Sequence, residues 1–131
     1  MKVLKGKVIY PGRVKGRALV TNEPIGFYGG IDPATGKITQ QGHPLYGETV
    51  TNRILVFPHG IGSTVGSYIL FRLKKNRKAP IGIIIEDAEP IVAVGGIISE
   101  IPMVYGVPIK EIKNNALVEI NEQGDVIIHD N

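Results

Sequence analysis

Two short, almost continuously apolar runs, RILVF at 53–57 and PIGIII at 80–85, flank a segment with helical periodicity. Runs of this kind are typical of strands that are covered on both faces, as in a parallel sheet. A strand, a crossover helix and a second strand form the unit that joins parallel neighbours. The helical spacing between the two runs comes from Val65, Tyr68, Ile69, Arg72 and Leu73. The pattern predicts an α/β domain with parallel strands and a helix over Thr64–Lys75.

The rest of the chain predicts further strands and a second, short helix over Glu89–Ile98. The end of the chain reads as a hairpin with its turn at Glu122–Gly124. No repeat or linker divides the 131 residues, so we expect one domain over 1–131 that is mostly strand with one main helix. The further predicted strands are Lys7–Tyr10 and Arg17–Thr21, expected to pair with each other, and Pro102–Tyr105 and Val126–Ile128.

The segment 22–52 has little periodicity and is rich in glycine and proline. Loops of this length inside a compact domain are functional or disordered. Its aromatic and apolar residues favour an ordered loop that packs, namely Phe27, Tyr28, Ile31, Leu45 and Tyr46. Gly29–Gly30 suits backbone with positive φ, and Asp32 before Pro33 suits a turn. Turn chemistry alone explains these residues, and a lid or interface loop is the alternative.

The stretch PHGIGSTVGSYIL, residues 58–70, places glycines and hydroxyls between a strand and a helix. Backbone N–H groups and the positive end of a helix dipole meet at such a turn and attract anions. A tight turn with Ser63 or Thr64 as helix N-cap is the simpler explanation. It does not account for Gly66 and Ser67 one turn later, because glycine inside a helix costs about 0.8–1.0 kcal/mol relative to alanine. The stretch is therefore a candidate site.

Composition excludes several classes of function. The net charge of +3 comes with one dense basic run, Lys74 to Lys78, which complements a helix C-terminus, so no nucleic-acid binding is expected. The absence of cysteine excludes disulfides, thiolate nucleophiles and an iron–sulfur cluster bound by this chain's own thiolates. No signal peptide and no membrane-spanning segment is expected, which predicts a cytoplasmic protein without a membrane partner.

The histidines and carboxylates give weaker signals. His43 and His59 could meet Asp32 at a metal ion, but their spacing has no motif character, so no metal site is predicted. His59, beside the glycine turn, is expected to orient a ligand or to make a structural hydrogen bond. Glu86, Asp87 and Glu89 follow a predicted strand, and a solvated strand end is favoured over an acid–base pair.

Four segments in order, FYGGIDPATGKI, HPLYGE, ILVFPHGIGSTVGSYIL and APIGIII, together resemble the small subunit of the aconitase X family. The resemblance implies a swivelling β/β/α domain with a β-barrel-like sheet. It also implies a heterodimer, in which this domain docks on a large aconitase-like subunit that carries a [4Fe-4S] cluster.

The activity that the resemblance implies is that of a hydro-lyase. It would dehydrate (R)-5-phosphomevalonate to trans-anhydromevalonate 5-phosphate in the archaeal mevalonate pathway to isoprenoids. In aconitase-like swivel domains a serine after a glycine is the catalytic base, and Ser63 occupies that position. The residues expected to bind the anionic small-molecule substrate around it are His59, Gly60, Gly62, Thr64 and Ser67, with Gly30 and Asp32 from the 22–52 loop.

Two departures from the family pattern bear on the substrate. Other members carry arginine where this chain has Ile61, and aconitases carry one where it has Val65. A cation for the substrate must therefore come from the partner or from elsewhere in the chain. Two alternatives stay open: dehydration of cis-3-hydroxy-L-proline, the sister activity of the family, and a non-enzymatic swivelling module that binds a ligand.

The chain is expected to need its partner for catalysis, because a serine hydroxyl is a weak acid. Lowering the pKa of a serine hydroxyl enough to hold an alkoxide at neutral pH costs about 8–11 kcal/mol. A helix N-terminus contributes at most about 2 kcal/mol of this. Backbone donors, cations of the partner and exclusion of water must supply the remainder, so the isolated chain is expected to be inactive.

Overall fold

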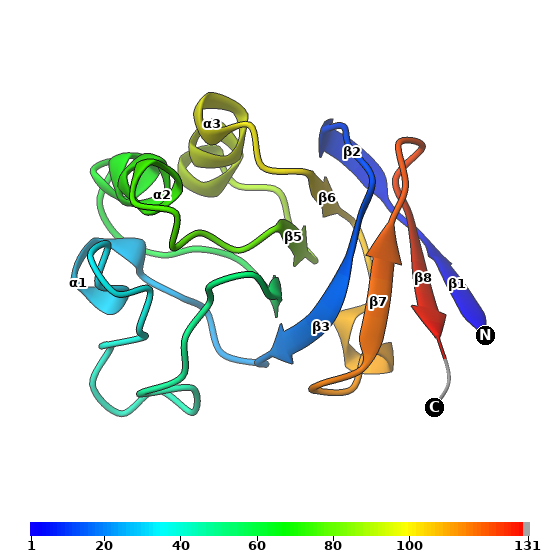
Figure 1. Ribbon diagram of the computed structural model, residues 1–131, viewed down its shortest axis with the longest axis horizontal. Coiled ribbons are helices and arrows are strands. Elements are labelled where there is room, and N and C mark those ends of the chain that lie inside the picture. Colours follow the sequence, from blue (N-terminus) through cyan, green and yellow to red (C-terminus); the bar gives the residue numbers. More distant parts are fainter. Residues whose placement is uncertain (130–131) are drawn as a thin grey trace.

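The computed structural model describes residues 1–129. Four parallel strands form the centre of the sheet: β3 (Val14–Val20), β4 (Ile54–Phe57), β5 (Gly82–Ile85) and β6 (Met103–Tyr105) (Figure 1). β4 and β5 are buried at every position, and Ile54 pairs with Gly82 in parallel register. The predicted parallel unit is therefore confirmed. Its carboxyl ends all lie at the same edge of the sheet.

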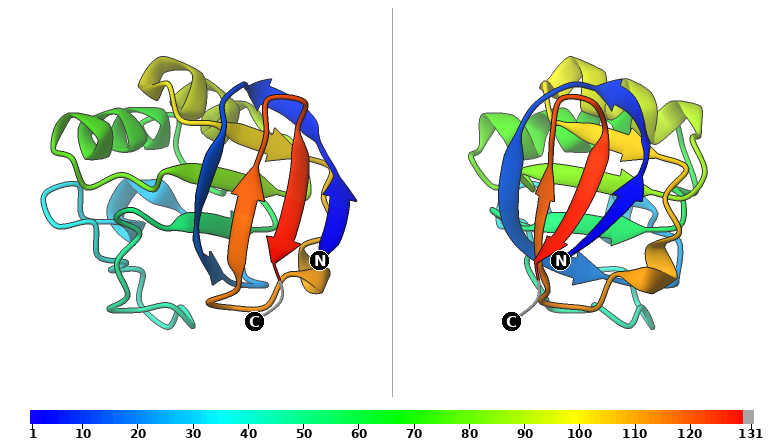
Figure 2. Two further views of the ribbon diagram at one scale, coloured as in Figure 1. Left: turned by 45° about the vertical axis from the view of Figure 1, so that its right-hand side comes forward. Right: turned by 90° about the vertical axis from the view of Figure 1, so that its right-hand side faces the viewer.

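Four more strands extend this core into one eight-stranded mixed sheet. They are β7 (Leu117–Ile120) and β8 (Asp125–His129), which form the predicted C-terminal hairpin, and β1 (Lys2–Lys5) and β2 (Lys7–Tyr10). The strand order is β1-β8-β7-β3-β4-β5-β6-β2. Its first and last strands are separated in sequence by Gly6 alone, so the sheet curls until its two ends are joined (Figure 2). The expected pairing of β2 with β3 is wrong, because β2 pairs with β6 and β3 with β7 and β4.

Alternate residues of the central strands face two separate hydrophobic cores. Ile54 and Val56 of β4 belong to the core enclosed by the curled sheet, whereas Leu55 and Phe57 contribute to the core beneath the helices. This two-sided burial explains why the β4 sequence is apolar throughout.

Two helices of equal length cover the outer face of the parallel strands, α2 (Gly66–Lys75) and α3 (Pro90–Ser99) (Figure 1). The expectation of one main helix is therefore wrong: the domain is mixed α/β and mostly strand, but it has two substantial helices. Two smaller elements are the four-residue helix α1 (Phe27–Gly30) and the 3-10 turn η1 (Ile109–Glu111). α3 is apolar around its whole circumference, so no amphipathic period marks it as a full helix. None of the helices within residues 1–129 is long and apolar enough to cross a membrane.

The 22–52 loop is ordered, and its interior is formed by Ile25, Phe27, Ile31, Ile38, Leu45 and Val50. The expectation of a packed loop is confirmed for Phe27, whose ring centroid lies 5.7 Å from that of Phe57. It is wrong for Tyr28 and Tyr46, which are exposed. The loop packs against the helix side of the sheet and so contributes to the first of the two cores.

The join between β1 and β2 gives a test of sheet closure. A Cβ at Gly6 would lie 2.9 Å from both the Gly124 carbonyl oxygen and a Val107 methyl. We predict that Gly6→Ala lowers the free energy of unfolding by about 1–3 kcal/mol, because the added methyl group crowds the β7–β8 turn at Gly124 and the segment after β6 at Val107. Chemical denaturation measures the change, with the exposed β3 variant Lys15→Ala as a control expected within about 0.5 kcal/mol of wild type. Equal stability of the two variants would contradict the tight join.

Candidate active-site loop

The loop at 58–65 leaves the carboxyl end of β4 and leads into α2. It is held from one side by Ile25, which forms a parallel bridge with Gly60. The Ile25 N–H donates to the His59 carbonyl at 3.3 Å, and the Ile61 N–H donates to the Ile25 carbonyl at 3.0 Å. The 22–52 loop is therefore attached directly to the glycine–serine turn.

Gly60 and Gly62 are required for two different reasons. A Cβ at Gly60 would lie 2.5 Å from a Val92 methyl and 2.7 Å from Glu89 Oε1, so the start of α3 leaves no room for a side chain. Gly62 has open space around it but a φ of 102°, a conformation that side chains with a Cβ rarely adopt. Gly62 thus sets the direction in which the chain enters Ser63.

Ser63 lies on the exposed part of this loop, one turn before α2. Its Oγ accepts a hydrogen bond from the Val65 N–H at 3.1 Å, and its carbonyl accepts one from the Gly66 N–H at 3.0 Å. The helix begins at Gly66, slightly later than predicted, and Val65 occupies the N-cap position. Within residues 1–129 the N–H groups of Gly62, Ser63 and Thr64 make no hydrogen bond. The turn therefore offers free donors beside the hydroxyl, at the positive end of a helix.

Gly66 and Ser67 hold α2 against its neighbours. A Cβ at Gly66 would lie 3.1 Å from a methyl of Ile91 and 3.5 Å from Phe27 Cβ, so both α3 and α1 approach the helix here. Ser67 is buried, and its hydroxyl donates to the Ile91 carbonyl at 2.7 Å. Close packing thus explains why Gly66 stands inside the helix despite its cost to helix stability. The hydroxyl of Ser67 joins α2 to α3, and its predicted role in substrate binding stays a prediction.

The other predicted site residues fall into two groups. His59, Gly60, Gly62 and Thr64 share the loop with Ser63. The Nδ1 of His59 lies 2.9 Å from the Gly60 carbonyl; because a carbonyl only accepts, this nitrogen is the donor of that hydrogen bond.

Asp32 and Gly30 belong to the 22–52 loop. The Asp32 carboxylate accepts from the Ala34 N–H at 3.0 Å and from the Thr35 hydroxyl at 3.1 Å, so it shapes its own turn. Gly29 has the expected positive φ, but Gly30 does not; a Cβ there would lie 3.1 Å from the Gln40 side chain. The expectation of positive φ at Gly30 is therefore wrong, and close packing is the reason for that glycine.

Near the loop, sequence reasoning missed the role of Gln40 and gave Glu89 the wrong role. Gln40 Oε1 accepts from the Gly26 N–H at 3.0 Å and so fastens the start of α1. Glu89 caps α3 through both carboxylate oxygens, which accept from the N–H groups of Ile91 at 3.0 Å and Val92 at 2.7 Å. The expectation of a solvated carboxylate is wrong for Glu89. A glutamate directly before Pro90 at a helix start was the available signal.

The charges around the loop are acidic rather than basic. No lysine or arginine occurs between Arg53 and Arg72 in the sequence. Two acidic residues, Glu86 and Asp87, follow β5 and lie beside the start of the loop, because the backbone N–H of each donates to the Pro58 carbonyl at 3.1 Å. The loop itself therefore offers an anion only its backbone donors, and any cation must come from elsewhere in this chain or from another chain.

Two clear pKa shifts lie away from this loop, on β7 and β8, drawn at the right of Figure 1. The pKa of the Glu119 carboxyl is lowered, chiefly by the hydrogen bond with His129 and also by Arg13. The pKa of Asp125 is lowered, chiefly by the hydrogen bond from Lys5. The hydrogen bonds that cause these shifts stabilise the β-hairpin region, and they do not mark a second reactive centre.

The chain offers no site for an iron–sulfur cluster of its own. It contains no cysteine. Within residues 1–129, no three histidine, aspartate or glutamate side chains are grouped so that they could hold a metal ion. The donor set therefore does not fit a cluster, and any such group must be held by another polypeptide.

A curled β-sheet with two helices on one face and an exposed serine turn is the architecture of a swivel domain. Residues 3–128 match the family described as the aconitase X swivel domain, and the chain belongs to this family. The resemblance found in the sequence is thereby confirmed.

Curated relatives share this sequence over nearly its whole length. The phosphomevalonate dehydratase small subunit of Pyrococcus horikoshii is 52% identical over 126 residues, covering 95% of this chain and 94% of the relative. That of Thermococcus kodakarensis is 47% identical over 126 residues, covering 95% of both. The crystal structure of Thermococcus kodakaraensis aconitase X in its holo form superposes with a TM-score of 0.98 at 45% identity, covering 99% of this chain and 100% of that chain.

The contacts of Glu89 give a test of how the loop is supported. We predict that Glu89→Ala lowers the free energy of unfolding by about 0.5–2 kcal/mol, because two N–H groups at the start of α3 lose their acceptor. Asp87→Ala is the matched control; it removes an exposed carboxylate nearby and should change stability by less than about 0.5 kcal/mol. Thermal and urea unfolding measure both. A Glu89→Ala protein as stable as the control would show that the cap is dispensable.

Proposed function

We propose that this chain is the small subunit of a phosphomevalonate dehydratase, a hydro-lyase that converts (R)-5-phosphomevalonate to trans-anhydromevalonate 5-phosphate in the mevalonate pathway. The observation that carries the proposal is the similarity to curated small subunits, at 47–52% identity over 95% of this chain. In this proposal the whole chain, 1–131, acts as one swivelling domain with a barrel-like sheet. It closes on a large subunit to form the active site.

Ser63 is the proposed catalytic base. As an alkoxide, its Oγ would take the proton from the carbon next to the substrate carboxylate, leaving a neutral hydroxyl on the serine. The electron pair of that C–H bond would form the double bond, and the hydroxyl of the neighbouring carbon would leave as water with a proton supplied by the partner. The Val65 N–H already donates to this oxygen at 3.1 Å, so one backbone donor is in place to stabilise the anion. The free N–H groups of Gly62 and Thr64 are further donors for the oxyanion or for the substrate.

The large subunit would supply what this chain lacks. Ser63 is exposed in the isolated chain, so water competes for its oxygen until a partner covers the loop. Residues 54–71 contain no lysine or arginine, so the cations that bind the carboxylate and phosphate of the substrate would come from the partner. We propose that the partner also carries the [4Fe-4S] cluster, because this chain has no cysteine to bind one.

The sister substrate of the family, cis-3-hydroxy-L-proline, is the second candidate. It stays open because Ile61 stands where other members carry an arginine, and Val65 stands where aconitases carry one, so no arginine of this turn selects the phosphorylated substrate. Assay of the reconstituted pair with both compounds under anaerobic conditions distinguishes them. Turnover of phosphomevalonate supports the proposal, and turnover of the hydroxyproline alone would replace it.

For the base itself, we predict that Ser63→Ala lowers kcat of the reconstituted complex by about 1000-fold or more, because proton abstraction loses its acceptor. The affinity for the large subunit and the melting temperature should stay within error of wild type, since the Ser63 side chain is exposed. Thr49→Ala, which removes an exposed hydroxyl elsewhere in the 22–52 loop, is the control with full activity. The isolated chain defines the background rate. Retained turnover in Ser63→Ala would eliminate Ser63 as the base.

The backbone of Gly62 gives a separate prediction. Gly62→Ala forces a side chain into a left-handed conformation that costs about 1–2 kcal/mol, and the loop should relax by moving Ser63. A displacement of about 1 Å is enough to lower kcat about 100-fold. Gly42→Ala is a matched control, because Gly42 also has positive φ and open space around it. It should lose similar stability but no activity. If both variants stayed fully active, the loop geometry would not matter for catalysis.

A further inference from the structure

The outer face of α3 is an unusual surface for a folded chain. The helix contains no charged residue, and only Ser99 is polar. Its inner face packs through Val92, Gly95 and Gly96, which are buried. Val94, Ile97 and Ile98 nevertheless remain exposed to solvent. A helix that is apolar all round is normally covered on all sides, so the outer face lacks a partner in this chain.

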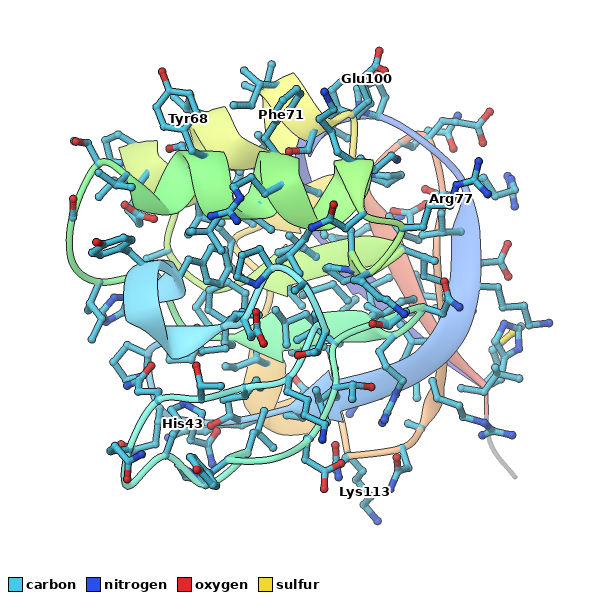
Figure 3. All side chains as sticks on the ribbon, turned by 60° about the vertical axis from the view of Figure 1, so that its left-hand side comes forward. His43, Tyr68, Phe71, Arg77, Glu100 and Lys113 are labelled. Carbon is cyan, nitrogen blue, oxygen red and sulfur yellow. The ribbon has the colours of Figure 1, made fainter. Side chains whose placement is uncertain are left out.

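The neighbouring part of α2 extends this surface. Figure 3 shows Tyr68 and Phe71 on the outer side of α2, next to α3. Both are exposed, Tyr68 by 63%. Eight of the twelve large apolar side chains that are exposed within residues 1–129 lie on α1, on the glycine–serine loop or on these two helices: Tyr28, Ile61, Val65, Tyr68, Phe71, Val94, Ile97 and Ile98.

A groove of about 430 Å³ runs between the two helices. We call it the apolar groove, and its lining residues are Thr64, Ser67, Tyr68, Pro90, Ile91, Val94 and Ile98. None of them is charged. Thr64, the residue that follows Ser63, is part of this lining.

The groove is rigid because its two walls are fastened together. The Ser67 hydroxyl donates to the Ile91 carbonyl at 2.7 Å. A Cβ at Gly95 would lie 2.7 Å from a methyl of Leu70 and 3.3 Å from Ser67 Cα, so the two helices approach as closely as glycine permits. A preformed groove loses little conformational entropy when it is filled.

We propose that an apolar segment of the large subunit seats in the apolar groove, and that this contact is what brings the large subunit over Ser63. The proposal rests on the proposed function and adds to it the surface through which the two subunits meet. The groove supplies the apolar centre of the interface, where binding energy is concentrated. The exposed donors of the serine turn lie at its edge.

Continuity with the serine turn points to this occupant. Thr64 belongs both to the turn and to the groove lining, and Ile61 and Val65 are exposed on either side of Ser63. A chain that filled the groove would therefore also cover the serine and exclude water from it. Charge points the same way: the turn has no nearby cation in sequence, and Glu86 and Asp87 lie at the end of the next strand. A partner that brings cations for an anionic substrate is complementary to that edge.

The test compares two valines with equal exposure. Val94 in the groove and Val3 on β1 are both 48% exposed. Each is replaced by glutamate in the full chain, and binding to the large aconitase-like subunit encoded in the same genome is measured by anaerobic titration calorimetry. Val94→Glu should weaken Kd by about 100-fold or more, because a charge is buried without a partner. Val3→Glu should leave Kd within about twofold of wild type.

A milder variant guards against misfolding. Ile98→Ala removes apolar surface without adding charge and should weaken Kd by about tenfold, with the melting temperature of each free variant checked beside wild type. Unchanged binding by Val94→Glu and Ile98→Ala, or an equal loss with Val3→Glu, overturns the proposal.

A second copy of this chain is the rival occupant of the apolar groove. Sedimentation that finds a monomer for the free wild-type chain supports the proposal, and a dimer dissociated by Val94→Glu overturns it.

Failure of this inference differs from failure of the proposed function. If the wild-type pair dehydrates phosphomevalonate but Val94→Glu binds as tightly as wild type, the function stands and the interface is wrong. If the pair associates through the groove but dehydrates neither family substrate, the interface stands and the function is wrong.

Discussion

Close packing between the loop after β4 and the start of α3 is the contact on which the rest of the structure depends. Gly60 gives Glu89 and Val92 the space to approach, and the Glu89 carboxylate caps α3 at that point. The Ile25 bridge holds the same loop from the other side. With both sides fixed, the chain enters α2 in one direction. The position of Ser63 therefore follows from packing around it rather than from contacts of its own side chain.

This arrangement separates rigidity from exposure. Gly60 and Gly66 are needed because other elements approach closely there, whereas the turn itself, with Gly62, stays open to solvent. An exposed hydroxyl beside free backbone donors is a poor base in water, since water solvates the oxygen and the donors alike. The same group becomes effective once a second surface removes the water. In the proposed function, a site divided between two polypeptides would follow directly from where the packing ends.

Sequence reasoning predicted the parts of the fold in which one physical rule dominates. The apolar runs at 53–57 and 80–85 gave the parallel core, because burial on both faces leaves a local pattern. It failed where long-range packing decides: β2 pairs with β6, far away in sequence, and not with β3 as expected. The helix expected over Glu89–Ile98 is present as α3, although it carries no amphipathic period. At the site, the exposed turn could be predicted from local glycine chemistry, but Gln40 could not, because its role depends on which loops meet. The Glu89 cap had a local signal, the proline that follows it.

The join at Gly6 has a consequence for the free edges of the sheet. β1 and β2 stand at the two ends of the strand order, and each is only four residues long. Three of their eight residues are lysines, Lys2, Lys5 and Lys7. Short, positively charged edges oppose the addition of strands from other molecules. A subunit that is made separately from its partner is thereby protected from self-assembly through its β-sheet, and its apolar helices are left as the surface for association.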